Sequence, residues 1–279
     1  MIFWLGLLWA QDKPAYLLYT SKGKLTSYTA LLLQAEKADV VFFGELHDDP
    51  IAHWLSYELV RDLHAKRQGE ILIGMEMFET DQQSALARYL GGLLTMEQLA
   101  ETIKLWPNFH TDYAPIVEWA QREKVPVYAT NAPRALAREI ARAGAMVMDR
   151  WDADKRSLVA PLPFPRLDSL QSYQQMSEMA ANHGMDPEPF RLAQMLKDAT
   201  MAYRIKEVWR PGKLFFHLNG SFHSDYKEGI AAYLRIYAPT LRVLNVSTVR
   251  VPDPKAYRPP KSGLADFILV VPESMTRTH

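Results

Sequence analysis

Short apolar runs alternate with helical patterns along most of the chain. Each run is only a few residues long and lacks a helical period, which is typical of strands buried on both faces of a sheet. Because strands that alternate with helices form βαβ units, this order predicts an α/β fold, a mainly parallel β-sheet flanked by helices. The predicted strands are Val40–Phe43, Ile71–Met75, Val125–Ala129, Leu214–Leu218, Leu241–Val246 and Phe267–Val271.

The segments between these strands repeat apolar residues at helical spacing, and two regions carry this spacing without a convincing strand. These regions span residues 79–113 and 152–210. We expect them to form a smaller helical subdomain on a single α/β domain that covers residues 1–279. The predicted helices are Ile51–Arg67, Gln82–Tyr89, Met96–Ile103, Ile116–Glu123, Arg134–Ala143, Ser169–Asn182, Glu188–Trp209 and Glu228–Ile236.

Composition excludes several kinds of protein. Lys+Arg and Asp+Glu both number 32, so the formal net charge is zero and the chain lacks the positive charge of a nucleic-acid binder. The sequence contains no cysteine. It therefore cannot form a disulfide, a thiolate zinc site, an iron–sulfur cluster, a cysteine nucleophile or a thioether bond to haem, and it has no cysteine for a lipid anchor.

The first ten residues, MIFWLGLLWA, are apolar throughout, and polar residues follow directly. The segment is too short to span a bilayer, which needs about 20 apolar residues. It is similar to the apolar region of a secretory signal, although no basic residues precede that region. We therefore expect an exported protein, periplasmic or associated with the envelope; the alternatives are a first strand and a misplaced start codon. No other stretch is long and apolar enough to be an integral membrane span.

The stretch VVFFGELHDDP, residues 40–50, ends an apolar run in a cluster of ionisable residues. Asp49 is of a type that caps helix N-termini, and Pro50 suits the first helical turn. The local prediction is therefore a strand, a charged turn and a helix. Because the charges lie within two residues of a buried strand, this turn is a candidate site.

Polar residues or glycines follow four of the predicted strands at the point where each strand ends. In an open parallel sheet, ligands bind in the crevice outside the carboxyl ends of the strands. We therefore expect these residues to line one pocket. A structural alternative applies to each alone, because acids and amides cap helices and glycines allow tight turns. The residues are Gly44, Glu45 and His47 after the first strand, Glu76 after the second, Asn131 after the third, and Asn219, Gly220 and His223 after the fourth.

Two of these strand ends repeat one spacing, Gly44-x-x-His47 and Gly220-x-x-His223. The glycines let the backbone turn sharply, so both imidazoles are expected at the same edge of the sheet. Two imidazoles with two nearby glutamates form a candidate site for a divalent metal. In another interpretation, Glu45 is a general base beside a metal-bound water. The catalytic and metal-ligating candidates are Glu45, His47, Glu76 and His223.

One acidic residue lies within a predicted helix rather than after a strand. Gln194, Asp198 and Met201 share one helix face, because they are spaced by about one and two turns. An acid on a face that otherwise carries methionine and alanine predicts partial burial with a partner. The alternative is a solvated helix charge.

Five segments between about residue 38 and residue 250 carry a family likeness: VVFFGELHDDPIAH, IGMEMFETDQQ, VYATNAPR, QMLKDATMAYRI and FHLNGSFHSDYKEGI. Together they resemble the ChaN-like haem-binding protein family, which is related to the Tiki/TraB and erythromycin-esterase-like proteins. The resemblance implies a parallel α/β domain with a small helical domain, and haem binding, often in iron-regulated envelope lipoproteins. In the related proteins, paired GxxH motifs and acids are associated with metal-dependent hydrolysis. The positions that match the family's motifs are Glu45, His47, Glu76, Asn131, Asp198, Gly220 and His223.

Haem binding, which would be non-covalent here, also needs apolar surface and an iron ligand. The helical regions supply aromatic and methionine side chains, and tyrosine and histidine can ligate haem iron. The candidate cofactor-binding residues are Tyr113, Tyr173 and Tyr203, with His110 and His183 as alternatives.

Three hypotheses follow from these patterns. The first is a haem-binding protein of iron uptake or haem handling in the cell envelope. The second is a metal-dependent hydrolase that uses the two GxxH motifs, and the third is an idle scaffold that kept the pocket for binding. Whether the chain is an enzyme, and whether it forms a homodimer, are left open.

Overall fold

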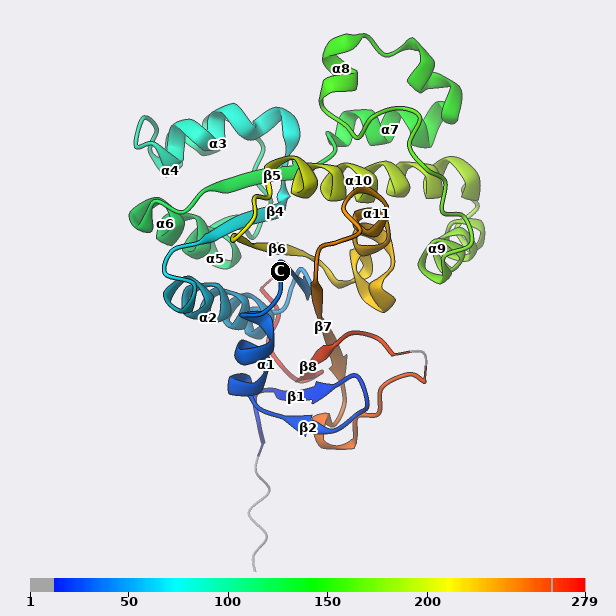
Figure 1. Ribbon diagram of the computed structural model, residues 1–279. Helices are drawn as coiled ribbons and strands as arrows, with labels where there is room; N and C mark the ends of the chain where they lie inside the picture. Colours follow the sequence, from blue (N-terminus) through cyan, green and yellow to red (C-terminus); the bar gives the residue numbers. More distant parts are fainter. Residues whose placement is uncertain (1–12, 262, 279) are drawn as a thin grey trace, which may run out of the picture.

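The computed structural model describes residues 13–261 and 263–278. In that part of the chain, eight strands form one sheet in the order β2-β1-β8-β7-β3-β6-β4-β5. All neighbours from β8 to β5 are parallel, whereas β1 pairs antiparallel with both β2 and β8. The predicted α/β fold with a mainly parallel sheet is therefore confirmed (Figure 1). The strands are β1 Leu17–Thr20, β2 Leu25–Thr26, β3 Val40–Glu45, β4 Ile71–Glu79, β5 Val127–Asn131, β6 Leu214–Gly220, β7 Val243–Val251 and β8 Phe267–Pro272.

Each predicted strand is present, but every one has a shifted boundary. Strands β3, β4, β6 and β8 extend beyond their predicted C-terminal ends, so Glu45, Glu76 and Gly220 lie within strands rather than after them. The third begins at Val127 rather than Val125, and the fifth runs from Val243 to Val251 rather than from Leu241 to Val246. Strands β1 and β2 were not predicted. They are short and partly exposed, so they lack the continuous apolar run that identifies a doubly buried strand.

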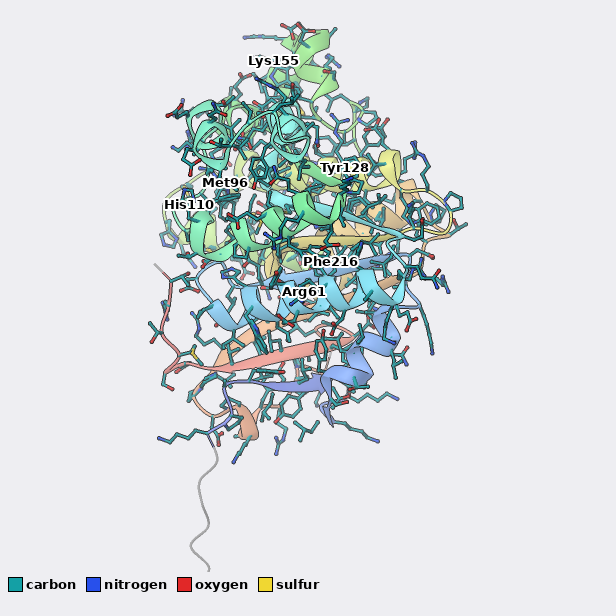
Figure 2. All side chains as sticks on the ribbon, turned by 90° about the vertical axis from the view of Figure 1, so that its left-hand side faces the viewer. Arg61, Met96, His110, Tyr128, Lys155 and Phe216 are labelled. Atoms are coloured by element: carbon teal, nitrogen blue, oxygen red, sulfur yellow. The ribbon has the colours of Figure 1, made fainter. Side chains whose placement is uncertain are left out.

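Helices cover both faces of the sheet and make a core on each (Figure 1). Side chains alternate between the cores, so Phe43 of β3 belongs to the one under α2 and Phe42 to the one under α10. Phe216 of β6 lies in the first core, while Arg61 of α2 is exposed (Figure 2). The helices are α1 Tyr28–Ala35, α2 Pro50–Lys66, α3 Gln83–Leu90, α4 Met96–Thr102, α5 Phe109–Asp112, α6 Ala114–Glu123, α7 Arg134–Ala143, α8 Ala153–Ser157, α9 Gln171–Asn182, α10 Pro187–Val208 and α11 Gly229–Tyr237.

The two regions predicted to be helical contain α3 to α5 and α8 to α10. Helix α10 packs on α7, α9 and α11 and belongs to the core on one face of the sheet. Helix α10 therefore covers one face of the sheet, as the flanking helices of an α/β domain do. A separate helical subdomain stays a prediction.

The apolar segment Met1–Ala10, on which export was predicted, lies outside the described residues. Among the residues that are described, no helix combines the length and the apolar character needed to cross a membrane.

Candidate functional site

The carboxyl ends of four neighbouring strands, β3, β6, β4 and β5, lie side by side. Parallel pairing places Glu45 opposite Gly220, at the ends of β3 and β6. The backbone N–H of Gly220 donates to Oε2 of Glu76 from the next strand, at 2.7 Å. The strand ends that follow from the sequence pattern therefore meet at one edge of the sheet.

The charged turn after β3 divides into residues that face the site and residues that support it. Asp49 accepts hydrogen bonds from the backbone N–H groups of Ile51 and Ala52, so it caps α2 as predicted. Arg250 of β7 pairs with Asp48 at 2.9 Å and with Asp49 at 3.1 Å. The two aspartates therefore fix the turn, which leaves Glu45 and His47 for the site.

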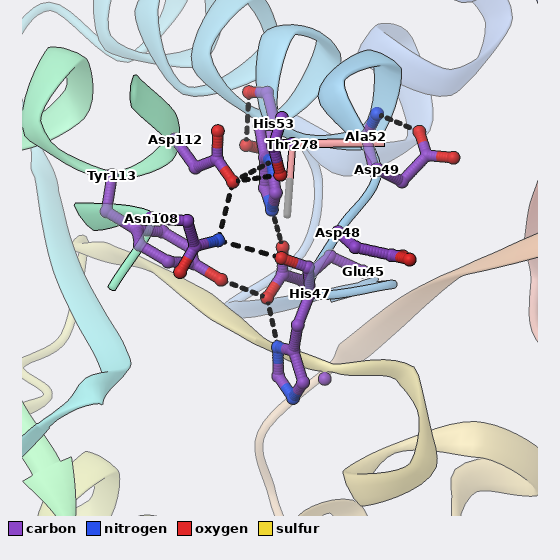
Figure 3. A network of polar contacts seen from close by, with 12 residues as sticks. Glu45, His47, Asp48, Asp49, Ala52, His53, Asn108, Asp112, Tyr113 and Thr278 are labelled. Carbon is purple, nitrogen blue, oxygen red and sulfur yellow. Dashed lines mark hydrogen bonds and ion pairs between the residues drawn. The ribbon is translucent and has the colours of Figure 1, made fainter. Parts of the chain in front are cut away.

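Glu45 is buried and holds three side chains (Figure 3). Its Oε1 accepts hydrogen bonds from Nδ1 of His47 at 2.6 Å and from the hydroxyl of Tyr113 at 2.9 Å. Its Oε2 contacts Nε2 of His53. Burial alone would raise the pKa of Glu45, but the hydrogen bonds from His47 and His53 outweigh it and the pKa is lowered. Glu45 is thus an ionised carboxylate that orients His47.

A second layer of polar residues supports that carboxylate. Nδ1 of His53 lies 3.2 Å from Asp112, which accepts hydrogen bonds from Asn108 at 2.5 Å and from the hydroxyl of Thr278 at 2.7 Å (Figure 3). Asn108 also donates to the backbone carbonyl of His47 at 2.8 Å. These residues were not identified from the sequence. The signal for His53 was its place one helical turn after the cap Asp49, which aims it back at the strand end.

His47 presents its ring to solvent, with 41% of the side chain exposed. The ring packs edge-on against Trp106, with centroids 4.8 Å apart. Burial lowers the pKa of His47. The hydrogen bond to Glu45 and the charges of Glu76 and Glu45 raise this pKa by more than burial lowers it, so the net shift is upward. With Nδ1 committed to Glu45, Nε2 is the atom that His47 offers to a ligand.

The two motif glycines are needed for close approach. A Cβ atom on Gly220 would lie 2.8 Å from Cε1 and Nε2 of His47. A Cβ atom on Gly44 would lie 2.8 Å from the Cα of Ser221 and 2.9 Å from the carbonyl oxygen of Val246. Both Gly44 and Gly220 have negative φ. The reason given from the sequence, a sharp turn, is therefore corrected to a lack of space for any side chain.

His223 lies between two buried carboxylates. Its Nδ1 contacts Asp198, and its Nε2 lies 3.1 Å from Oε1 of Glu76. Burial would lower the pKa of His223, but the charges of Glu76 and Asp198 and their hydrogen bonds raise it to about 10. For Glu76, burial raises the pKa, and the charge and hydrogen bond of His223, with smaller effects of His47 and Gly220, lower it. At neutral pH an imidazolium therefore joins two carboxylates.

Asp198 is buried and has a partner besides His223, as its helix face predicted. The hydroxyl of Tyr173 donates to Oδ2 of Asp198 at 2.6 Å. Gln194, on the same face of α10, places its Nε2 3.0 Å from Nδ1 of His223. Helix α10 therefore contributes a polar face to the site.

Besides Glu45, Asp198 and the two motif glycines, which are buried, four predicted site residues do not reach the surface of the site. Tyr113 and Tyr173 are buried and donate to Glu45 and Asp198, and burial raises both pKa values. Tyr203 packs against Tyr237, with ring centroids 5.8 Å apart. Asn219 is fully buried, where its amide donates to Ser224 at 3.0 Å. The three tyrosines thus support the site or the core, and Asn219 supports the turn after β6.

A cavity of about 480 Å³ opens where these strand ends meet helices α7 and α10. Its floor is polar, and its walls mix small apolar residues with positively charged ones. It brings together four of the residues predicted to form the pocket or the site: His47, Glu76, Asn131 and His223. The other lining residues are Glu79, Trp106, Ala132, Arg134, Ala137, Arg138, Ala141, Phe190, Ala193, Gln194 and Lys197.

The four predicted metal ligands form two separate pairs instead of one convergent set. Glu45 binds His47, and Glu76 binds His223. Across the described residues, no group of three or more His, Asp or Glu side chains is arranged to hold a metal ion. The prediction of a divalent metal is therefore not supported. The arrangement offers two imidazoles, each held by a carboxylate, on the floor of one cavity.

Comparison with known proteins gives one family and several solved structures. A model of the family described as haem-binding uptake, Tiki superfamily, ChaN matches residues 31–234. No curated protein sequence matches the chain. ChaN of Campylobacter jejuni, which binds haem cofacially, is 18% identical, with a TM-score of 0.70 over 92% of this chain and 96% of that one.

Two further structures are less similar. A protein from Bacillus cereus is 12% identical, with a TM-score of 0.52 over 87% of this chain and 90% of its own. An erythromycin esterase mutant in its open conformation is 13% identical, with a TM-score of 0.48 over 91% of this chain and 82% of its own. At these identities, the likeness to ChaN and to the B. cereus protein concerns the fold alone.

Proposed function

The chain belongs to the haem-binding uptake family of the Tiki superfamily, the family of ChaN, and from this membership we propose that it binds haem in the uptake or handling of haem iron. The family match carries the proposal. It covers residues 31–234, a span that includes every residue lining the cavity at the sheet edge.

The residues of the cavity fit such a ligand. Trp106 and Phe190 supply aromatic surface beside the alanines of the walls. His47 would hold the iron, because its Nδ1 is fixed by Glu45 and its partly exposed ring lines the cavity. A ligating histidine usually donates its other ring nitrogen to a carboxylate or carbonyl in this way. Haem would supply the iron, and the absence of cysteine requires that it be held without a thioether bond.

Titration with haemin tests this proposal. We expect a saturable change in Soret absorbance on adding haemin to the purified chain, and complete release of the pigment in acid–acetone. His47→Ala should weaken the change, whereas His64→Ala, a substitution in α2 outside the cavity, should not. If the wild-type chain gives no saturable Soret change, the proposal is wrong.

Location in the cell envelope is a further proposal. It is supported by the apolar segment Met1–Ala10, which has the composition of a secretory signal. The chain, expressed with its own N-terminus in a Gram-negative host, should appear in the periplasmic or membrane fraction and lose this segment. Recovery only from the cytoplasm, at full length, would contradict export.

A second candidate function is hydrolysis by acid–base chemistry, and the pairing of His223 with Glu76 and Asp198 favours it. Buried carboxylates that shift the pKa of an imidazole at a cavity are common at catalytic sites. Chromogenic esters and phosphoesters would test this candidate. Turnover that disappears in a His223→Gln variant that is still folded would support it, and equal turnover in that variant would contradict it.

A further inference from the structure

The cavity has two helical walls that are built alike. Helix α7 lines it with residues spaced by three, four and seven positions, which places them on one face of the helix. Helix α10 does the same from the other side, and the two helices pack on each other. Both faces include alanines, Ala137 and Ala141 on α7 and Ala193 on α10, whose small side chains leave space between the helices. The α7 residues are Arg134, Ala137, Arg138 and Ala141, and the α10 residues are Phe190, Ala193, Gln194 and Lys197.

These walls carry more positive than negative charge. Arg134 lies 3.7 Å from Glu79. Within residues 13–261 and 263–278, the side chains of Arg138 and Lys197 form no ion pair or hydrogen bond. A neighbouring cavity of about 440 Å³ shares Arg134 and Arg138 with the first and adds Lys104. Because Glu76 is already paired with His223, these cations face an opening with little negative charge to balance them.

The floor contains one polar atom without a partner. Asn131 is 7% exposed, and its Nδ2 donates to the backbone carbonyl of Glu76 at 3.1 Å. Its Oδ1 has no hydrogen-bond partner among the described residues. Buried polar atoms are rarely left in that state, so an unpaired amide oxygen on the floor of a cavity indicates a place for a bound molecule.

We propose that this cavity binds an amphipathic organic acid. The apolar body of the ligand lies between the alanine faces of α7 and α10, its acidic groups pair with Arg138 and Lys197, and its buried end completes the contacts of Asn131. Haem, an apolar macrocycle with two carboxylates, has this chemistry. The proposal therefore rests on the proposed function and deepens it, because it assigns the carboxylates of haem to Arg138 and Lys197, which lie near the middle of α7 and α10.

The test compares ligands with and without carboxylates on charge-matched variants. Haemin, metal-free protoporphyrin IX and protoporphyrin IX dimethyl ester are titrated into the full chain, with Soret absorbance or porphyrin fluorescence as the readout. The variant is R138Q/K197Q. The control, R142Q/K206Q, removes the same charge from exposed positions of α7 and α10 outside the cavity.

We expect R138Q/K197Q to bind haemin and protoporphyrin roughly 10- to 100-fold more weakly, since it loses charge-assisted hydrogen bonds. Its affinity for the dimethyl ester should match that of the wild type, and the control should bind all three ligands normally. Ala141→Trp, which fills the cavity from an exposed position, should weaken binding of the ester as well.

The outcomes separate this inference from the proposed function. If the wild type binds haemin and R138Q/K197Q binds it equally well, the cavity assignment is wrong while haem binding stands. If only protoporphyrin binds, and the variant weakens it, the inference holds and the function in haem iron fails. If neither porphyrin acid binds the wild type, both are overturned.

Discussion

Nε2 of His223 lies 3.1 Å from Oε1 of Glu76, and this contact joins the turn after β6 to the end of β4. The other ring nitrogen of His223 contacts Asp198 of α10, so one imidazole connects three elements of the fold. All three side chains are buried. Such a group stabilises the fold only while the imidazole is charged, because two carboxylates would otherwise share a dry site.

His223→Gln tests this dependence on charge. Removing one partner of a buried ion pair typically costs about 3–5 kcal/mol, so the variant should unfold at lower urea concentration at pH 6. The pKa of His223 is raised to about 10 in the folded chain, against about 6.5 for an unperturbed histidine. The contribution of His223 to the unfolding free energy is therefore complete below about pH 6.5 and is lost as the pH rises to about 10.

Urea unfolding of wild type and His223→Gln at pH 6, 8 and 10 gives the measurement. The difference in unfolding free energy should shrink as the pH rises, and His183→Gln, at an exposed position, should follow the wild type throughout. A difference that stays constant from pH 6 to pH 10 would mean that the charge of His223 does not matter to stability.

Tyr173, which is buried, and Tyr237, which is partly buried, allow a matched test of hydrogen bonding to Asp198. Tyr173→Phe removes the hydroxyl that donates to Asp198 at 2.6 Å, and hydrogen bonds to charged groups contribute about 1.5–3 kcal/mol. The hydroxyl of Tyr237 is buried without a hydrogen-bond partner in the described part of the chain. Tyr237→Phe should therefore be neutral or stabilising, because it removes an unsatisfied polar group. Equal losses of melting temperature in the two variants would contradict this account of Asp198.

The two motif glycines should respond differently to alanine. In Gly44→Ala the new methyl group meets backbone atoms of Ser221 and Val246, which cannot move aside, so we expect a loss of about 1–3 kcal/mol of stability. In Gly220→Ala it meets the ring of His47, which is partly exposed and can rotate away. Gly220→Ala should therefore keep its stability better but shift the Soret band or weaken haemin binding. If Gly220→Ala binds haemin with the same affinity and the same Soret band as the wild type, the position of His47 does not matter for the ligand.

The sequence predicted the presence and order of the six parallel strands well, although not their ends, because each doubly buried strand leaves a continuous apolar run. Asn131, His47 and His223 could be assigned to one edge on the rule that parallel strands share it. Asp198 was also recognised, since an acid on a helix face with methionine is unusual.

The sequence could not predict which of these residues form ion pairs or hydrogen bonds with neighbouring side chains. Glu45 and Glu76 are residue types that fit a metal site, but Glu45 pairs with His47 and Glu76 pairs with His223. The spacing of residues in the sequence does not predict these side-chain contacts. Two of the tyrosines predicted to bind the cofactor are likewise buried, with hydroxyls that donate to carboxylates. Tyr113 lies on α5–α6, far from Glu45 in sequence, and only the packing of these helices on β3 brings the hydroxyl to the carboxylate.

Asp225 gives the last prediction, because it is an acid that the fold does not accommodate well. It lies in the turn before α11, and its Oδ1 is buried with no hydrogen-bond partner among the described residues. Burial raises the pKa of Asp225 to about 7.

An acid with a raised pKa costs stability as the pH rises from the pKa of the unfolded chain, about 3.9, to the pKa of the folded chain, and the cost is constant above that pH. Asp225→Asn removes the charge, so its melting temperature should exceed that of the wild type at pH 8 by much more than near pH 4.5, where only a small part of the cost between the two pKa values has accumulated. Thermal unfolding at the two pH values checks this, with Asp253→Asn, an exposed turn residue, as the control for net charge. A gain at pH 8 that is no larger than the gain at pH 4.5 would show that Asp225 is already compensated in the folded chain.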